Sequence, residues 1–335
     1  MSTISPRLRA QFVKSGWIFT TLLSIALCGC STLRVKLGSR VEIAKLPVAS
    51  MEAKLVGDPG VAPGERSPLI VTFLQPDGTV LTTEGAGKGK VLWRDLVVSA
   101  TLVSVNKKGV VSLAHDPRAS DGKIGHLTIT VPSHPGLQTE LDVPVRYDYA
   151  FAASFRGADG NNGLDGTDGI SGSPGSMGSM DPNNPSAGGD GGNGTNGSDG
   201  GNGGDGGDGP NVQVLLRLRP GNPALLQASV TADGHRPWFY LVDPNGGSLT
   251  VNSVGGSGGA AGRGGRGGSG GSGGIGTPSG NSGSSGMDGS DGRPGSDGSP
   301  GRITVQYDAS AKPFLSVLHV PASATLQETS VSPPW

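Results

Sequence analysis

Short stretches of alternating apolar and polar residues, separated by turn signals, fill residues 60–148. The strand candidates there are 68–74, 79–83, 91–98, 101–105, 110–113, 126–131 and 137–147. Turns such as Pro76-Asp77-Gly78 separate neighbouring candidates, as is typical of an all-β domain. Because no stretch keeps a sustained 3.6-residue period, the pattern predicts a β-sandwich over residues 60–150.

A second set of strand-like stretches lies between glycine-rich runs in the C-terminal half. The candidates are 145–155, 212–218, 225–231, 237–242, 248–254, 303–307 and 313–320. The runs cover 157–178, 188–209 and 255–301. Where the chain leaves the runs, it enters the strand-like stretches 212–218 and 303–307. The pattern therefore predicts a β framework over 151–320 from which the runs project. The remaining residues, 321–335, are rich in Ser, Thr and Pro and are expected to form a flexible tail.

Glycine recurs at every third residue within the runs. The third run keeps this spacing from Gly256 to Gly301 with one break, at Thr277, where Thr277-Pro278 predicts a turn. A period of three fits neither the 3.6 of an α-helix nor the 2 of a strand. It is the period of the polyproline II helix.

Three structures are compatible with such runs. A collagen trimer would need proline at about 15–20% or more, whereas proline in the runs is limited to Pro174, Pro278, Pro294 and Pro300. Disordered Gly-rich loops are the second alternative. The third is an intrachain bundle, which is favoured because both ends of each excursion are fixed in one β framework. In a bundle, Gly-Gly-x triplets such as 206–208 suit interior segments and Gly-Ser-Asp at 295–297 suits a peripheral one.

Two resemblances agree with this organisation. The triplet repeat resembles the glycine-rich bundles of snow flea antifreeze proteins and of some phage tail-fibre tip adhesins. The central Trp93, the hairpin VSVNKKGVVSL (103–113) and the closing strand LDVPVRY (141–147) resemble bacterial immunoglobulin-like domains. Together they imply a mostly β chain, with an Ig-like β-sandwich followed by a β framework that carries a polyproline II bundle. Neither resemblance implies a particular activity.

The N-terminus has the features of an export signal. The basic residues Arg7, Arg9 and Lys14 precede an apolar segment at 17–27, which is too short to span a bilayer as a helix. The sequence LCGCS at 27–31 resembles the lipobox of bacterial lipoproteins, which implies cleavage after residue 29 and lipidation of Cys30. An ordinary cleaved signal peptide and an uncleaved anchor are the alternatives.

Lipidation at Cys30 would also determine whether the mature protein can form a disulfide and to which membrane it is delivered. Cys28 and Cys30 are the only cysteines, so a chain that begins at Cys30 has no internal disulfide. Residues 30–59 are expected to form the lipidated N-terminus and a linker. Because Ser31 is not the aspartate that retains such proteins in the inner membrane, a Gram-negative cell would deliver the protein to its outer membrane.

Aspartate accompanies many triplets, which raises the question of calcium. The ten positions are Asp159, Asp165, Asp168, Asp190, Asp199, Asp205, Asp208, Asp288, Asp291 and Asp297. The calcium-binding β-roll also needs regularly spaced aliphatic residues, and 188–209 contains none. Solvated carboxylates are the simpler interpretation, with a calcium-responsive binding module as the alternative.

Other local patterns carry no chemistry. The segment 85–90 lacks the spacing of a phosphate-binding loop, and Gly-Ser-Gly matches to G-x-S-x-G arise by chance in a Gly/Ser run. The five histidines show no ligand spacing, and the cluster 238–240 is expected in a strand core. With 26 basic and 27 acidic residues, the charge indicates no nucleic-acid partner.

The sequence therefore predicts no enzyme, no cofactor and no metal ligand, and Cys30 is its one assigned site. We expect a membrane-anchored protein of the cell envelope with a structural or adhesive role. Its partners would be the lipid bilayer, through Cys30, and a glycan or an envelope protein.

Overall fold

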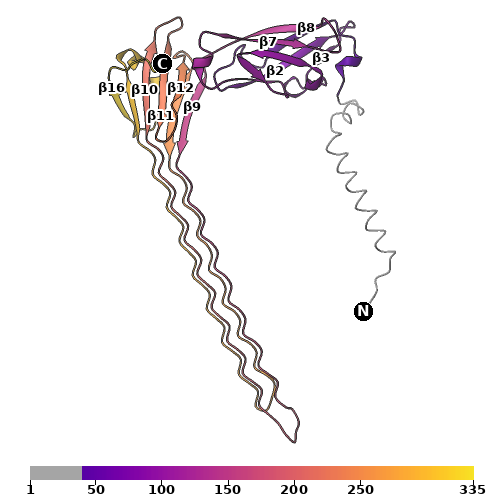
Figure 1. Cartoon of the computed structure of the whole chain (residues 1–335), viewed down its shortest axis with the longest axis vertical. Helices are drawn as coiled ribbons and strands as arrows, with labels where there is room; N and C mark the ends of the chain where they lie inside the picture. Colours follow the sequence, from indigo (N-terminus) through magenta and orange to yellow (C-terminus); the bar gives the residue numbers. More distant parts are fainter. Residues whose placement is uncertain (1–39) are drawn as a thin grey trace. The chain divides into compact units, whose positions relative to one another are not determined.

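The computed structural model describes residues 40–335. The predicted signal segment (1–29) and the lipidation site Cys30 lie outside the described residues. The chain divides into two compact units, Met1–Tyr147 and Asp148–Trp335, which are described separately (Figure 1). β-strands are the main regular secondary structure of the described residues in both units, as predicted.

The first unit has two antiparallel sheets that share one hydrophobic core. Its strands are β1 Ser50–Leu55, β2 Arg66–Leu74, β3 Val80–Thr82, β4 Val97–Thr101, β5 Val103–Val105, β6 Val110–Leu113, β7 Ile124–Thr130 and β8 Gln138–Pro144. One sheet has the order β1-β2-β6-β5, with β3 also paired to β2, and the other has the order β4-β7-β8. Fully buried Phe73 of the first sheet and Leu127 of the second belong to the same core.

Two predictions for this unit differ from the structure. The expected strand 91–98 is interrupted by the 3-10 turn η3 (Trp93–Asp95). There the indole Nε1 of Trp93 donates to the Glu84 carbonyl (3.2 Å), and the ring lies where Gly109 leaves room for it. Within the expected linker 30–59, the described residues 40–59 belong to the fold, because β1 pairs with β2 and Ile43 is fully buried.

The second unit has a five-stranded and a three-stranded sheet. Its strands are β9 Ala150–Arg156, β10 Val212–Arg219, β11 Leu225–Ala232, β12 Trp238–Val242, β13 Ser248–Val254, β14 Ile303–Tyr307, β15 Leu318–His319 and β16 Thr325–Glu328. The sheet orders are β12-β11-β10-β14-β16 and β15-β13-β9. The predicted strands from 212 to 254 and at 303–307 are confirmed.

The C-terminal segments differ from expectation. Most of the expected strand 313–320 belongs to the 3-10 segment η5 (Ala309–Val317), because Pro313 cannot donate to a strand ladder. The expected flexible tail instead pairs through β16 with β14. Val331 is buried, and the Trp335 carbonyl accepts a hydrogen bond from the Gln227 side chain (3.2 Å).

The glycine runs project from one end of these sheets, as predicted (Figure 1). The third run turns back at 277–279, where the Thr277–Pro278 peptide is cis, so that there are four segments. We name them run 1 (157–178), run 2 (188–209), run 3 (255–276) and run 4 (280–301). Runs 1 and 3 continue β9 and β13 outward, and runs 2 and 4 lead back into β10 and β14.

Candidate interaction surface

The four runs are hydrogen-bonded to one another along their whole length. Runs 1 and 3 are parallel (Gly166 N to Arg263 O, 2.7 Å), and so are runs 2 and 4 (Gly197 N to Met287 O, 2.9 Å). Antiparallel bonds join run 1 to run 2, run 2 to run 3 and run 3 to run 4. Runs 2 and 3 therefore each contact three other runs, and runs 1 and 4 each contact two.

This packing explains where glycine is required. The interior runs 2 and 3 carry mostly Gly-Gly-x triplets, and the outer runs 1 and 4 carry one glycine per triplet. In run 3, the glycine row from Gly256 to Gly274 is buried. A Cβ atom at Gly265 would lie 2.0 Å from the Thr167 carbonyl oxygen, so a side chain there would force two backbones apart.

The aspartates of the runs bond to backbone. All ten accept a backbone N–H of a neighbouring run at 2.7–2.8 Å. Asn162, Asn193, Asn196 and Asn202 accept in the same way. These side chains are rungs between runs, and they satisfy amides that the glycine triplets leave unpaired. The ten carboxylates are exposed, as predicted, but each also accepts a backbone hydrogen bond that the sequence analysis did not predict.

The rungs had a signal in the sequence that composition alone missed. Every rung residue occupies the last position of its triplet, directly before the next glycine. Asp and Asn share one side-chain oxygen at the same distance from the backbone, so either residue can accept this bond. The alternation of Asp and Asn at one triplet position thus indicates a structural acceptor rather than a metal ligand.

The runs are acidic although the whole chain is nearly neutral. They contain ten aspartates and the three arginines Arg263, Arg266 and Arg293, a net charge of 3 − 10 = −7, against −1 for the whole chain. At the base of run 1, the Ser257 N–H that donates to Asp159 holds the pKa of that carboxyl below its usual range, and the nearby Arg156 guanidinium acts in the same direction.

Charged and apolar side chains are separated along the runs. We define the distal end as residues 170–196 and 268–287, that is, the far parts of the four runs with both turns. Its charged residues are Asp181 and Asp190 alone. The part of the runs nearer the sheets exposes one large apolar side chain, Leu164. The distal end exposes five: Ile170, Met177, Met180, Ile275 and Met287.

Met177 and Ile275 lie on the adjacent runs 1 and 3 at this end. The Gly178 N–H, next to Met177, donates to the Ile275 carbonyl at 2.8 Å. Met177 is 80% exposed and Ile275 is 54% exposed. An apolar pair exposed to this degree, on a surface with only two charged residues, is the composition of an interface core rather than of ordinary surface.

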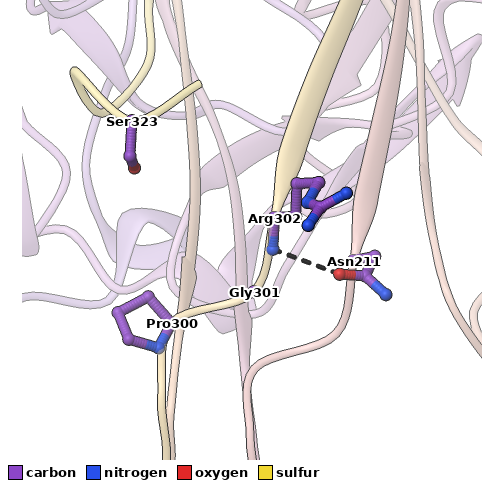
Figure 2. Close-up of a pocket in the computed structure, with 5 residues that line it drawn as sticks. All are labelled: Asn211, Pro300, Gly301, Arg302 and Ser323. Carbon is purple, nitrogen blue, oxygen red and sulfur yellow. Dashed lines mark hydrogen bonds between the residues drawn. The ribbon is translucent and has the colours of Figure 1, made fainter. Parts of the chain in front are cut away.

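A hollow lies at the other end of the runs, where run 4 enters β14. Asn211, Pro300, Gly301, Arg302 and Ser323 line it (Figure 2). The Arg302 backbone N–H donates to Asn211 Oδ1 at 3.2 Å. This rung continues the Asp and Asn series of run 2 up to the residue directly before β10.

The remaining sequence motifs are structural where the structure describes them. Segment 85–90 starts with the 3-10 turn η2 (Gly85–Gly87), and the element that follows it is the 3-10 turn η3 rather than an α-helix. Tyr240 is buried against Phe151 and its hydroxyl donates to the Ala152 carbonyl (3.2 Å); burial raises the pKa of this phenol. Within residues 40–335, no three His, Cys, Asp or Glu side chains are placed to hold a metal ion.

The chain matches no protein-family model, no curated protein and no solved structure. Among the described residues, no helix has the length and apolar character needed to cross a membrane.

Proposed function

We propose that this protein is a lipid-anchored exported protein that makes a non-catalytic adhesive contact through the distal end of its glycine runs. In this proposal the four runs are polyproline II segments that form one rigid rod. The period of three and the hydrogen bonds within one chain support it. Each run has 22 residues, so at 3.1 Å per residue the rod would be about 70 Å long.

The rest of the chain would connect this rod to the membrane. The lipobox-like sequence at 27–31 supports anchoring of the protein in a lipid bilayer through Cys30. In a Gram-negative cell this bilayer would be the outer membrane. The first unit would be an Ig-like spacer that follows the anchor in sequence. A rod whose interior is backbone hydrogen bonds can be thin and stiff without a hydrophobic core, which suits a contact made at a distance from the membrane.

The observation that carries the proposal is the separation of charge from exposed apolar side chains. Interface cores are poor in charged residues and rich in methionine and aromatic residues, with polar residues around them. The distal end has this composition, with Met177, Met180 and Ile275 among Ser, Asn and Gly. Methionine adapts its shape to a partner's pocket, so we propose a protein partner with apolar pockets.

A lipid surface is a poorer partner for this end. Segments that bind membranes through their surface combine Lys or Arg with Trp, Phe or Leu. The distal end has no Lys, Arg, Trp, Tyr, Phe or Leu, and its two charged residues are acidic. No observation favours the calcium-responsive alternative, because each run aspartate already bonds to backbone.

The test compares two changes of the same kind at the two ends of the runs. Met177→Ser with Ile275→Ser removes the apolar pair, and Leu164→Ser removes an exposed apolar side chain nearer the sheets. Burying such side chains stabilises a complex by about 1.5–3 kcal/mol each, so the double variant should bind at least tenfold more weakly. Binding is measured as the amount of full-length protein, reconstituted in lipid vesicles, that is retained on cells of the source organism.

The control should bind as the unmodified protein does. Equal loss in both variants would mean that binding does not use the distal end, and full retention by the double variant would refute the adhesive role. The anchor is tested apart from this: Cys30→Ala should release the protein from membranes, and persistent attachment would contradict lipidation.

A further inference from the structure

The outward face of the five-stranded sheet carries two rows of polar side chains at the end nearest the runs. Thr231, Gln213, Thr304 and Thr325 are partners across β11, β10, β14 and β16. The row two residues closer to the runs continues the same face. We name both rows together the polar platform: Thr231, Gln213, Thr304, Thr325, Asp233, Asn211, Arg302 and Ser323. The alternate residues Val212 and Ile303 are buried on the opposite face.

Hydrogen bonds hold the planar groups of the platform in place. Asn211 accepts the Arg302 N–H (3.2 Å, Figure 2) and donates through Nδ2 to Asp233 Oδ2 (3.0 Å). Gln213 Nε2 donates to Gln306 Oε1 at 3.1 Å. Groups fixed before binding lose little conformational freedom when a ligand arrives, which favours affinity.

The platform is hollowed, and an aromatic contact covers β12 on the same face. One hollow lies between Arg302 and Ser323, and a second lies over Gln213, Thr231, Asp233 and Thr304; both include Asn211. Farther from the runs, the Trp335 ring packs on Phe239 with ring centres 5.1 Å apart. The two hollows share Asn211 and Arg302, and together they form a polar groove that extends from Thr231 on β11 across β10 and β14 to Ser323.

The chemistry of this groove fits a ligand with many hydroxyl groups and no net charge. The Arg302 guanidinium only donates hydrogen bonds, the Asp233 carboxylate only accepts them, and the amides and hydroxyls do both. The two charges cancel, and Asp208, whose Oδ1 accepts the Ser299 N–H one triplet away, disfavours an anion. An open groove admits a chain better than it encloses a small molecule.

We propose that the polar platform binds a neutral oligosaccharide chain. The site lies at the opposite end of the runs from the adhesive contact, and it does not depend on that proposed function. Arg302, Gln213 and Ser323 contact sugar hydroxyls as donors, and Asp233 and the threonines accept from them.

Calorimetric titration of the full-length protein with maltohexaose, cellohexaose and chitohexaose tests the site. At least one should bind, and Gln213→Leu with Thr304→Val should weaken that binding about tenfold, from two lost hydrogen bonds of about 0.5–1.5 kcal/mol each. Ser323→Ala, in a loop where sheet pairing is not at risk, should weaken it by a smaller factor. Thr304→Ser keeps a hydroxyl at this position and should bind as the unmodified protein does. Thr128→Val, the same kind of change in β7 of the first unit, should also leave binding unchanged.

Three outcomes would overturn the proposal. The first is that none of the three neutral hexasaccharides binds. The second is binding that neither the platform variants nor Ser323→Ala weakens. The third is binding of hexagalacturonate alone, since an anionic ligand held by Arg302 is a different site from a neutral one.

Discussion

Neighbouring glycines in run 2 should respond in opposite ways to the same substitution. A Cβ atom at Gly203 would lie 2.1 Å from the Gly259 carbonyl oxygen in run 3. A Cβ atom at Gly204 would have the Asn161 nitrogen of run 1 as its nearest neighbour, at 3.3 Å. The positions Thr195 and Ser198 belong to the same triplet row as Gly204 and already carry side chains. Gly203→Ala and Gly204→Ala therefore form a matched pair.

The difference can be worked from these distances. Carbon and oxygen approach to about 3.3 Å, so Gly203→Ala must separate runs 2 and 3 by about 1.2 Å. Overpacking of this kind costs about 1–3 kcal/mol, and the stretched Gly259 N–Gly204 O bond (2.8 Å) costs about 1 kcal/mol more. Both variants gain about 0.4–1 kcal/mol because alanine restricts the unfolded chain. The net expectation is a loss of about 2–3 kcal/mol for Gly203→Ala and a slight gain for Gly204→Ala.

Amide hydrogen exchange on the full-length protein measures this locally. Peptides from runs 2 and 3 should exchange about 30-fold faster or more in Gly203→Ala, and no faster in Gly204→Ala. Peptides of the first unit serve as the internal reference in both variants. If the two substitutions changed the exchange equally, the carbonyl contact would not be what requires glycine, and the packing argument would fail.

The remaining predictions concern the rungs and the acidity of the runs. Gly204→Ser should stabilise the runs by about 0.5–1.5 kcal/mol, because Thr195 Oγ1 already accepts the Ile170 N–H (2.7 Å) at the equivalent place; the unfolding midpoint in denaturant checks this. Asp205→Asn should be neutral and Asp205→Leu should lose about 1 kcal/mol by the same measurement, since Asp205 accepts the Ser296 N–H (2.7 Å). Because the pKa of Asp159 is lowered in the folded protein, ionised Asp159 stabilises the fold above the ordinary aspartate pKa of about 3.9. This stabilisation is lost as the pH falls through the lower folded pKa. In Asp159→Asn, the free energy of unfolding should therefore decrease less steeply as the pH falls. EDTA followed by calcium should leave the thermal midpoint unchanged, and a rise with calcium would restore the calcium-responsive alternative.

The sequence predicted most of the strands because their apolar alternation is local information. It failed where tertiary contacts decide: Trp93 turns inward against Gly109, and β1 and β16 are edge strands that exist because β2 and β14 are there to pair with. The points where the runs join the sheets were also predictable, because one apolar strand ends at Val254 and another begins at Ile303.

The surface features were harder to predict. The role of the aspartates depends on which run lies beside each one, and residues such as Asp190 and Asn281 are 91 positions apart in sequence. The polar platform depends on strand register in the same way. The distal end was visible in composition, but its meaning required knowing that residues 170–196 and 268–287 come together.

The two periods in this unit together fix one alignment of the runs. A slip of three residues would restore every glycine contact, so the runs alone specify their register weakly. The runs, however, continue strands: β9 and β13 pair at a separation of 98 residues, and Asp165 bonds to the Arg263 N–H at the same separation. Because strands alternate with period two, a slip of three would turn buried Phe151 and Val251 outward. The shortest slip that satisfies both periods is six residues, which would leave one of the seven β9–β13 pairs and none of the five β10–β14 pairs. The sheets therefore determine the register that the glycine triplets extend, and the rungs reinforce it along the runs.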